Sequence, residues 1–192
     1  ARGFALSALG VVVLLYFLLA SGDLFLRKVV AVTPRLSDKK RAVDIARQRV
    51  AAAIGATPEE ILFTSGATES DNMAIKGAAW AAVAAGQTGR HIVTSSIEHR
   101  AVLESCAFLA TQGFHITHVP VDSAAMVDPG DVRRAITDGT ILISIMHANS
   151  EVGTIQPVSE IGAIAREHGI PFHVDATQTV GKLPVDVEEL KA

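Results

Sequence analysis

A run of small polar residues follows a short apolar segment and has the chemistry to hold a phosphate. Residues 61–64 predict a strand, Ser65 and Gly66 predict a tight turn, and Ala67 and Thr68 open a helix. A helix start presents free backbone N–H groups and the positive end of the helix dipole, which favour an anion. The alternative is that these residues only cap the helix, as they do at many such joints.

Asp175 is a second candidate, because it ends the apolar strand-length run 171–174. A buried carboxylate without a partner is costly, so Asp175 needs one, and a protonated ring nitrogen is a suitable group. An N-cap for the segment that follows explains the position equally well. Ligands of open α/β sheets bind beyond the carboxyl ends of the strands, so both candidate segments are expected at that edge.

Strand-length apolar runs alternate with helical patterns from about residue 43 onward. Besides 61–64 and 171–174, we expect strands at 91–95, 114–119 and 140–146. Helices are expected over 43–54, where Gly55 would end the helix as a C-cap, from 67 to about 85, and near 100–111, 129–136 and 158–168. This alternation predicts an α/β fold with a mostly parallel sheet flanked by helices.

Composition and charge limit the classes of function. The 192 residues suffice for one substantial domain. A net charge of −3 gives no sign of a polyanion-binding surface, so no nucleic-acid partner is expected. The single cysteine, Cys106, excludes an internal disulfide, predicts no metal cluster and suits a reducing compartment. Its apolar helical surroundings indicate an inert core thiol rather than a nucleophile.

The first part of the chain has a different character. Residues 3–22 carry no charged side chain, and a helix of that length reaches about the thickness of a bilayer core. The basic residues that follow would place the downstream part in the cytoplasm. We expect a transmembrane helix over 3–22. A signal peptide fits less well because the apolar run is long, and a buried core helix is the third possibility.

Three segments closely resemble the cysteine desulfurases of the class V aminotransferase superfamily. They are FTSGATESDN at 63–72, EHRAVL at 98–103 and HVDATQTVGK at 173–182, and their order and spacing match as well. The resemblance covers about 41–192 and implies a partial large domain of the pyridoxal-phosphate (PLP) transferase fold. It implies removal of sulfur from L-cysteine, giving alanine and an enzyme-bound persulfide. Iron–sulfur cluster assembly, sulfur-acceptor or scaffold proteins as partners, and a homodimer when complete are implied too.

The resemblance also assigns roles to individual residues. Ala67 and Thr68 would contact the cofactor phosphate. His99 would stack over the cofactor ring and move protons, a task suited to a side chain that titrates near neutrality. Without the resemblance, His99 reads as a solvent-facing histidine at a helix start. Asp175 would keep the ring nitrogen protonated, and Gln178 would donate to the phenolic oxygen of the ring.

Two positions depart from the family pattern. An asparagine that helps hold the cofactor usually precedes the Glu-(Ile/Val)-Gly of the family, but here Ser150 occupies that position and Asn149 lies one residue earlier. Ser150 can still form hydrogen bonds, although with shorter reach. The family's cofactor-binding lysine lies in a Ser-x-His-Lys segment that would come after Ala192, followed by the catalytic cysteine. Lys182 and Lys76 are poor substitutes, so the chain as given is expected to be catalytically incomplete.

Residues 1–45 resemble instead a membrane-helix end and loop of the permease-like autoinducer-exporter family. The sequence therefore predicts an unrelated apolar helix and basic loop over 1–40, and the partial PLP-dependent domain over 41–192. The latter would be cytoplasmic, either free or held at the membrane by the first helix. Two other functions remain open: a membrane-anchored, non-catalytic module, or a fragment of a multi-span exporter.

Overall fold

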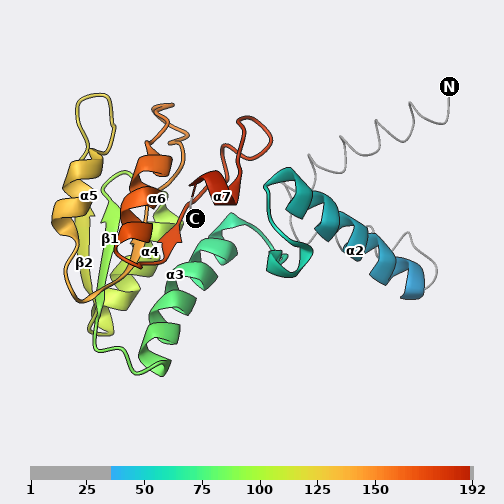
Figure 1. The fold of residues 1–192 in the computed structure, drawn as a ribbon, viewed down its shortest axis with the longest axis horizontal. Coiled ribbons are helices and arrows are strands. Elements are labelled where there is room, and N and C mark those ends of the chain that lie inside the picture. The colour runs from blue at the N-terminus through green and yellow to red at the C-terminus, as the bar shows by residue number, and fades with distance from the viewer. Residues whose placement is uncertain (1–35, 191–192) are drawn as a thin grey trace. The chain divides into compact units, whose positions relative to one another are not determined.

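The structure is a computed structural model that describes residues 36–190 (Figure 1). The expected transmembrane helix over 3–22, and most of the exporter-like segment, lie outside the described residues. Within 36–190, no helix combines the length and the apolar character needed to cross a bilayer. The chain divides into two compact units between Ser70 and Asp71, and each is described by itself.

The first unit contains the helix α2 (Leu36–Ala53) and the short 3-10 helix η1 (Pro58–Glu60). The expected helix over 43–54 is confirmed and starts earlier. Gly55 follows it with a φ of 70°, the left-handed conformation that a C-cap glycine adopts. Before η1, the backbone N–H of Thr57 donates to Glu60 Oε2 at 2.7 Å. The acidic side chain thus satisfies a free donor at the start of η1.

The strand expected at 61–64 is wrong. These residues form an irregular connection between η1 and the next helix, and no described residue pairs with them in a sheet. Apolar character alone does not make a strand, because a strand also needs a neighbour to receive its backbone hydrogen bonds.

The second unit is built around a four-stranded sheet in which all neighbours are parallel, in the order β2-β1-β3-β4. The strands are β1 (His91–Ser95), β2 (His115–Val119), β3 (Thr140–Ser144) and β4 (Phe172–His173). The helices are α3 (Ala67–Ala84), whose first turn lies before the unit boundary, α4 (Arg100–Thr111), α5 (Pro129–Ala135), α6 (Val158–Glu167) and α7 (Val187–Leu190). The expected parallel α/β fold is confirmed.

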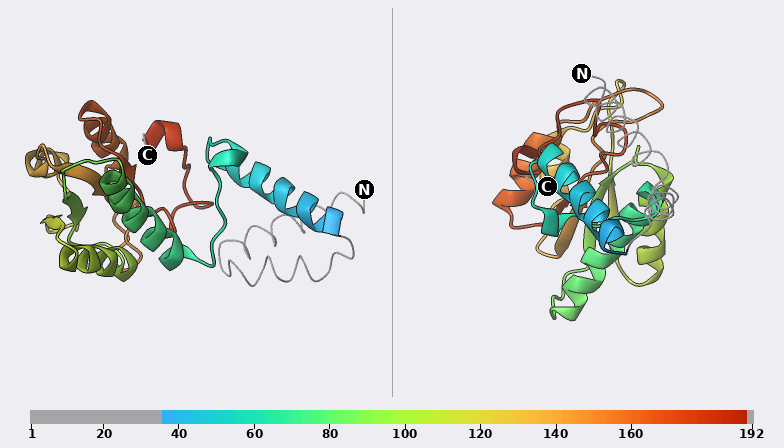
Figure 2. Two further views of the ribbon diagram at one scale, coloured as in Figure 1. Left: turned by 90° about the horizontal axis from the view of Figure 1, so that it is seen from below. Right: turned by 90° about the vertical axis from the view of Figure 1, so that its right-hand side faces the viewer.

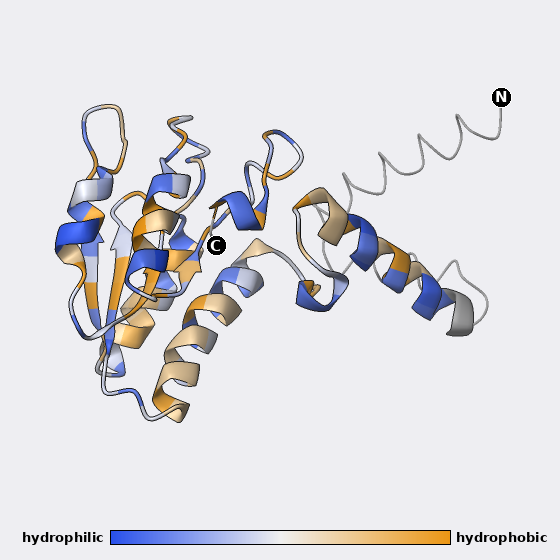
Figure 3. Cartoon of the chain, viewed as in Figure 1, coloured by the Kyte–Doolittle hydropathy of each residue, from blue (hydrophilic) through white to orange (hydrophobic). Residues whose placement is uncertain are grey.

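Helices cover both faces of the sheet, as Figure 2 shows, with α3 and α4 on one side and α5 and α6 on the other. Side chains alternate between the faces along each strand. Ile92 packs with α3 and α4, whereas its neighbour Val93 packs with α5 and α6. Cys106 lies in the α3–α4 layer and is fully buried, so the expected core thiol is confirmed. Figure 3 shows that α3 is largely apolar, whereas α5 is mostly hydrophilic.

The strands end slightly before the apolar runs that predicted them. The run 140–146 yields a strand that stops at Ser144, and 171–174 yields only Phe172–His173. Backbone hydrogen bonds nevertheless continue past both ends. The N–H of Ile145 donates to His173 O at 3.1 Å, and that of His147 donates to Asp175 O at 2.9 Å. The chain after β3 therefore runs alongside Asp175.

Candidate functional site

The carboxyl edge of the sheet gathers buried polar side chains. The chain leaves the central strand β1 for β2 on one side and later enters β3 on the other. The connection that follows β1 thus leads to one side of the sheet, and the later connection leads to the other side. Open parallel sheets form a ligand crevice between the two strands where this direction changes, which are β1 and β3 here. The segments that follow β1, β3 and β4 meet there.

Asp175 follows β4 at this edge and is 9% exposed. Its Oδ1 accepts a hydrogen bond from the backbone N–H of Thr177 at 3.0 Å. Asp175 therefore makes the hydrogen bond that the N-cap interpretation predicted, although the segment after it is a turn and not a helix. This bond orients the carboxylate without neutralising it, so Asp175 can still pair with a cation.

Glu98 lies in the turn between β1 and α4 and is 6% exposed. Its Oε1 accepts from Ser95 Oγ at 2.5 Å and from the backbone N–H of Met146 at 2.9 Å. Burial raises the pKa of the Glu98 carboxyl to about 7, against the lowering effect of these two hydrogen bonds. The charges of Asp175 and Asp71 raise this pKa further. The sequence did not single out Glu98, although it opens the second motif, because its burial and its contact with Met146 arise only in the folded sheet.

A second buried chain of polar groups joins α3, β4 and β3. Asp71, which is 3% exposed, places Oδ1 3.6 Å from His173 Nε2. The other ring nitrogen of His173, Nδ1, lies 2.8 Å from Ser144 Oγ. The order Asp–His–Ser resembles a hydrolytic triad, but Ser144 is fully buried and cannot reach a substrate. These three residues therefore link α3, β4 and β3 near the carboxyl edge of the sheet.

His99 is exposed and forms the N-cap of α4, where its Nδ1 accepts from the N–H of Ala101 at 3.1 Å. The expectation of a solvent-facing histidine at a helix start is thus confirmed. Since Nδ1 acts as an acceptor, the ring proton of neutral His99 resides on Nε2. Its stacking on a cofactor ring remains a prediction.

The loop after β3 carries Ser150 at its surface and Asn149 in a half-buried position. Asn149 Nδ2 donates to the carbonyl of Ile97 at 3.0 Å, and its Oδ1 accepts from the N–H of Glu151 at 2.8 Å. Asn149 therefore fastens this loop to the turn between β1 and α4. It cannot also take over the ligand contact predicted for the position that Ser150 occupies.

Gln178 is exposed, and its Oε1 accepts from Lys182 Nζ at 3.2 Å. Lys182 is exposed too, as expected of a surface lysine. Lys76 Nζ donates to Asn72 Oδ1 at 2.5 Å and lies 4.6 Å from the centre of the Phe108 ring. Both lysines are therefore engaged in local contacts along or beside their own segments.

Ala67 is half-buried and Thr68 exposed at the start of α3. The preceding turn is closed by the N–H of Ser65, which donates to Glu69 Oε2 at 2.6 Å. A helix begins where the phosphate seat was expected. The two residues precede the boundary between the units, so their proximity to Asp175 stays a prediction.

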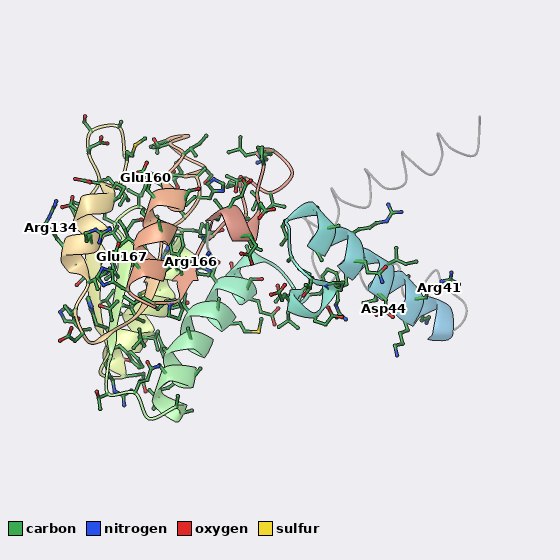
Figure 4. The ribbon with its side chains drawn as sticks, in the orientation of Figure 1. Arg41, Asp44, Arg134, Glu160, Arg166 and Glu167 are labelled. Carbon is green, nitrogen blue, oxygen red and sulfur yellow. The ribbon has the colours of Figure 1, made fainter. Side chains whose placement is uncertain are left out.

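A cavity of about 490 Å³ lies elsewhere, between the loop after β2 and the starts of α5 and α6. None of the expected site residues lines it. Two of its acidic lining residues, Asp128 and Asp131, pair with Arg134, which Figure 4 labels on α5. We regard the sheet edge, and not this cavity, as the candidate site, because the buried unpaired groups converge at the edge.

Known proteins resemble this chain in sequence and in fold. The aminotransferase class-V family model matches residues 28–192. The chain is 55% identical to the cysteine desulfurase IscS of Dictyoglomus turgidum over 153 residues, which are 80% of this chain and 38% of that protein. It is 57% identical to the IscS of Methanosarcina thermophila over 151 residues, or 79% of this chain and 37% of that protein. The chain thus spans less than half the length of these curated relatives.

Solved structures share the fold. The structure of SspA in complex with cysteine superposes with a TM-score of 0.76 at 42% identity, covering 83% of this chain and 46% of that one. A NIFS-like protein gives a TM-score of 0.77 at 35% identity, covering 91% and 51% of the two chains.

Proposed function

Because the chain belongs to the class V aminotransferase family, we propose that its sheet edge is the ring-binding part of a PLP site that serves cysteine desulfuration. Asp175 carries this proposal. It is a buried carboxylate at the carboxyl end of a parallel sheet, held in orientation by one backbone N–H.

The residues at the edge fit a cofactor with a cationic ring. Glu98 Oε2 and Asp71 Oδ2 are buried and have no hydrogen-bond partner among the described residues. Asp71 Oδ2 and the Asp175 carboxylate are the acceptors that suit a protonated ring nitrogen at this edge. When bound, PLP supplies an electron sink that stabilises negative charge on the substrate carbon.

Each remaining residue has a task in the proposal. Asp175 holds the proton on the ring nitrogen. His99, through its exposed Nε2–H, exchanges protons with the substrate. Ser150 and Gln178 donate hydrogen bonds to the cofactor, and Ala67 and Thr68 receive its phosphate at the start of α3.

L-cysteine is the proposed substrate, and the products are alanine and a persulfide, formed when an acceptor thiol takes the sulfur of the substrate. The support is the identity of more than half of the aligned residues with IscS proteins, together with the cysteine-bound SspA among the structural neighbours. Dimer formation and delivery to a scaffold protein belong to the same proposal.

Binding of pyridoxamine 5′-phosphate tests the cofactor site, because this amine cannot react with surface lysines. The full chain is titrated by equilibrium dialysis, with Asp175→Asn as the variant and the exposed Asp138→Asn as its control. Asn at 175 can still accept from Thr177, so folding should be retained while affinity falls roughly tenfold or more, the worth of one charge-assisted bond. Equal affinity of the two variants, or no saturable binding, would contradict the proposal.

The substrate is tested separately with ¹³C-labelled L-cysteine, PLP and the full chain. Formation of labelled alanine supports desulfuration. A chain that binds pyridoxamine phosphate but produces no alanine would limit the proposal to cofactor binding.

A further inference from the structure

Glu98 is a buried acid to which the proposed function gives no task. It sits at the reversal point between β1 and β3, and it touches both sides of that point. Ser95, the last residue of β1, donates to its Oε1, and so does the backbone N–H of Met146 just beyond β3. One carboxyl oxygen therefore joins the ends of two neighbouring strands.

The two oxygens of Glu98 are not equivalent. Oε1 receives both hydrogen bonds, whereas Oε2 is buried with no partner among the described residues. A charged carboxylate would leave the negative charge on Oε2 unsatisfied in a low-dielectric setting. A proton on Oε2 removes that charge and leaves both contacts of Oε1 unchanged.

The groups around Glu98 also favour its protonated form. Asp175 and Asp71 act on it electrostatically, and both are themselves buried. His173 Nε2 lies 3.6 Å from Asp71 Oδ1, whereas no basic side chain in the described part of the chain pairs with Glu98. The charge of Glu98 also raises the pKa of the Cys106 thiol on α4. The two buried carboxyls that act on Glu98, those of Asp175 and Asp71, therefore both disfavour its ionisation.

We propose that Glu98 is a positioning residue which, carrying a proton, ties the turn that bears His99 to the end of β3 and leaves Asp175 as the acid that contacts the ring nitrogen. The first part concerns the fold of this chain. The second part rests on the proposed function, since it says which of the two neighbouring acids serves the ring nitrogen.

The proposal predicts the direction in which the free energy of unfolding changes with pH. A carboxyl with a raised pKa binds its proton more tightly in the folded than in the unfolded chain. Its contribution is complete below about pH 4.5 and is lost as the pH rises to about 7. Burial lowers the pKa of His91 and His147, which gives stability that rises with pH up to about 6.5. Wild type alone would mix these opposing effects, so the Glu98 contribution is read as a difference between variants.

Glu98→Gln is the informative variant, because an amide reproduces the protonated carboxyl: one oxygen accepts and the other end donates. Glu98→Ala removes the tie altogether. Glu104→Gln, on the exposed face of α4, is the matched control for loss of one glutamate charge. Urea unfolding of the full chain without cofactor is measured for all four proteins from pH 5 to pH 8.

We expect Glu98→Gln to gain on wild type as the pH rises, with the ratio of their folding constants changing by on the order of 100-fold between pH 5 and pH 8. Glu98→Ala should be the least stable at every pH, and Glu104→Gln should follow wild type. A ratio that stays constant with pH, or a Gln variant as unstable as the Ala variant, would overturn the proposal.

Binding of pyridoxamine phosphate separates this inference from the proposed function. If wild type does not bind it, the proposed function fails while the unfolding series still decides the state of Glu98. If wild type binds it, Glu98→Gln should bind within about threefold of wild type and Glu98→Ala more weakly. A Gln variant that loses binding as Asp175→Asn does would show that the charge of Glu98 is needed, and would overturn the proposal.

Discussion

At the scale of single residues, the chemistry of this protein depends on which buried acids keep their charge. Asp175, Glu98 and Asp71 all lie below one tenth exposure, yet their surroundings differ. Asp71 has a histidine beside it, Glu98 has two neutral donors, and Asp175 has one backbone N–H. Similar groups can therefore take different roles, because neighbours and not residue type set the protonation state.

Cys106 gives a prediction at this scale. Its thiol is fully buried, and burial raises its pKa to about 12 from an ordinary 9.0. A rise of about three units lowers the thiolate fraction roughly 1,000-fold, so the folded chain should react with a disulfide reagent at least that much more slowly than the chain in urea. The rate of thiol modification, followed by absorbance, checks this. Comparable rates in the two states would show that Cys106 is accessible and that the core packing is wrong.

At the scale of elements, the ends of helices and strands place the polar groups. His99 caps α4 and is thereby fixed at the sheet edge, while the turn before it holds Glu98 inward. The same turn is linked to the loop after β3 through Asn149. Two connecting segments far apart in sequence are thus held together by the side chains of Glu98 and Asn149.

Two glycines give opposite predictions for the same change. Gly77 lies within α3, and a Cβ placed there would meet no atom within 4 Å. Gly77→Ala should raise the free energy of unfolding by about 0.5–1 kcal/mol, because alanine is the better helix former. Gly89 precedes β1, and its Cβ would lie 2.7 Å from the carbonyl oxygen of Gly139. Gly89→Ala should lower stability by about 1–3 kcal/mol, because backbone must move.

Urea unfolding of both glycine variants beside wild type measures the two effects. Each serves as the control for the other, since both add one methyl group. A change of the same sign in both would contradict the assignment of Gly77 to an open helix surface and Gly89 to a close backbone contact.

At the scale of the whole second unit, stability comes from two apolar layers that share one sheet. Ile92 and Leu142 face α3 and α4, whereas Val93 and Ile143 face α5 and α6. The sheet is apolar on both sides, and the central strands β1 and β3 contribute side chains to both layers. The site lies where these strands end, which makes its geometry dependent on the packing beneath it.

Ile143 tests this dependence. It is fully buried in the layer beneath α5 and α6 and belongs to β3, just before the segment that carries Met146. Ile143→Ala should lower the free energy of unfolding by about 2–5 kcal/mol through lost burial and a cavity. The control is Ile155→Ala, at a side chain 49% exposed, which should change stability by no more than about 0.5 kcal/mol. Equal losses for the two variants in urea unfolding would refute the described core.

The sequence alone determined the elements and their class. Apolar periodicity predicted α4 at its observed bounds and located each of the four strands of the sheet to within a few residues, because helical and extended repeats are local properties. The motifs also led to Asp175 and His99, and to the family to which the chain belongs. The error at 61–64 has the complementary cause: a strand exists only with a neighbour, and a local pattern does not show one.

Only the tertiary structure decided which polar groups are buried together. Glu98 and Met146 are 48 positions apart, and Asp71 reaches His173 across about a hundred residues, so no local pattern joins them. Burial and neighbouring charges set the pKa of Glu98, and both come from strands that meet only when the sheet is assembled. Residue types reveal what chemistry is possible, while the fold decides which acids are buried and which groups surround them.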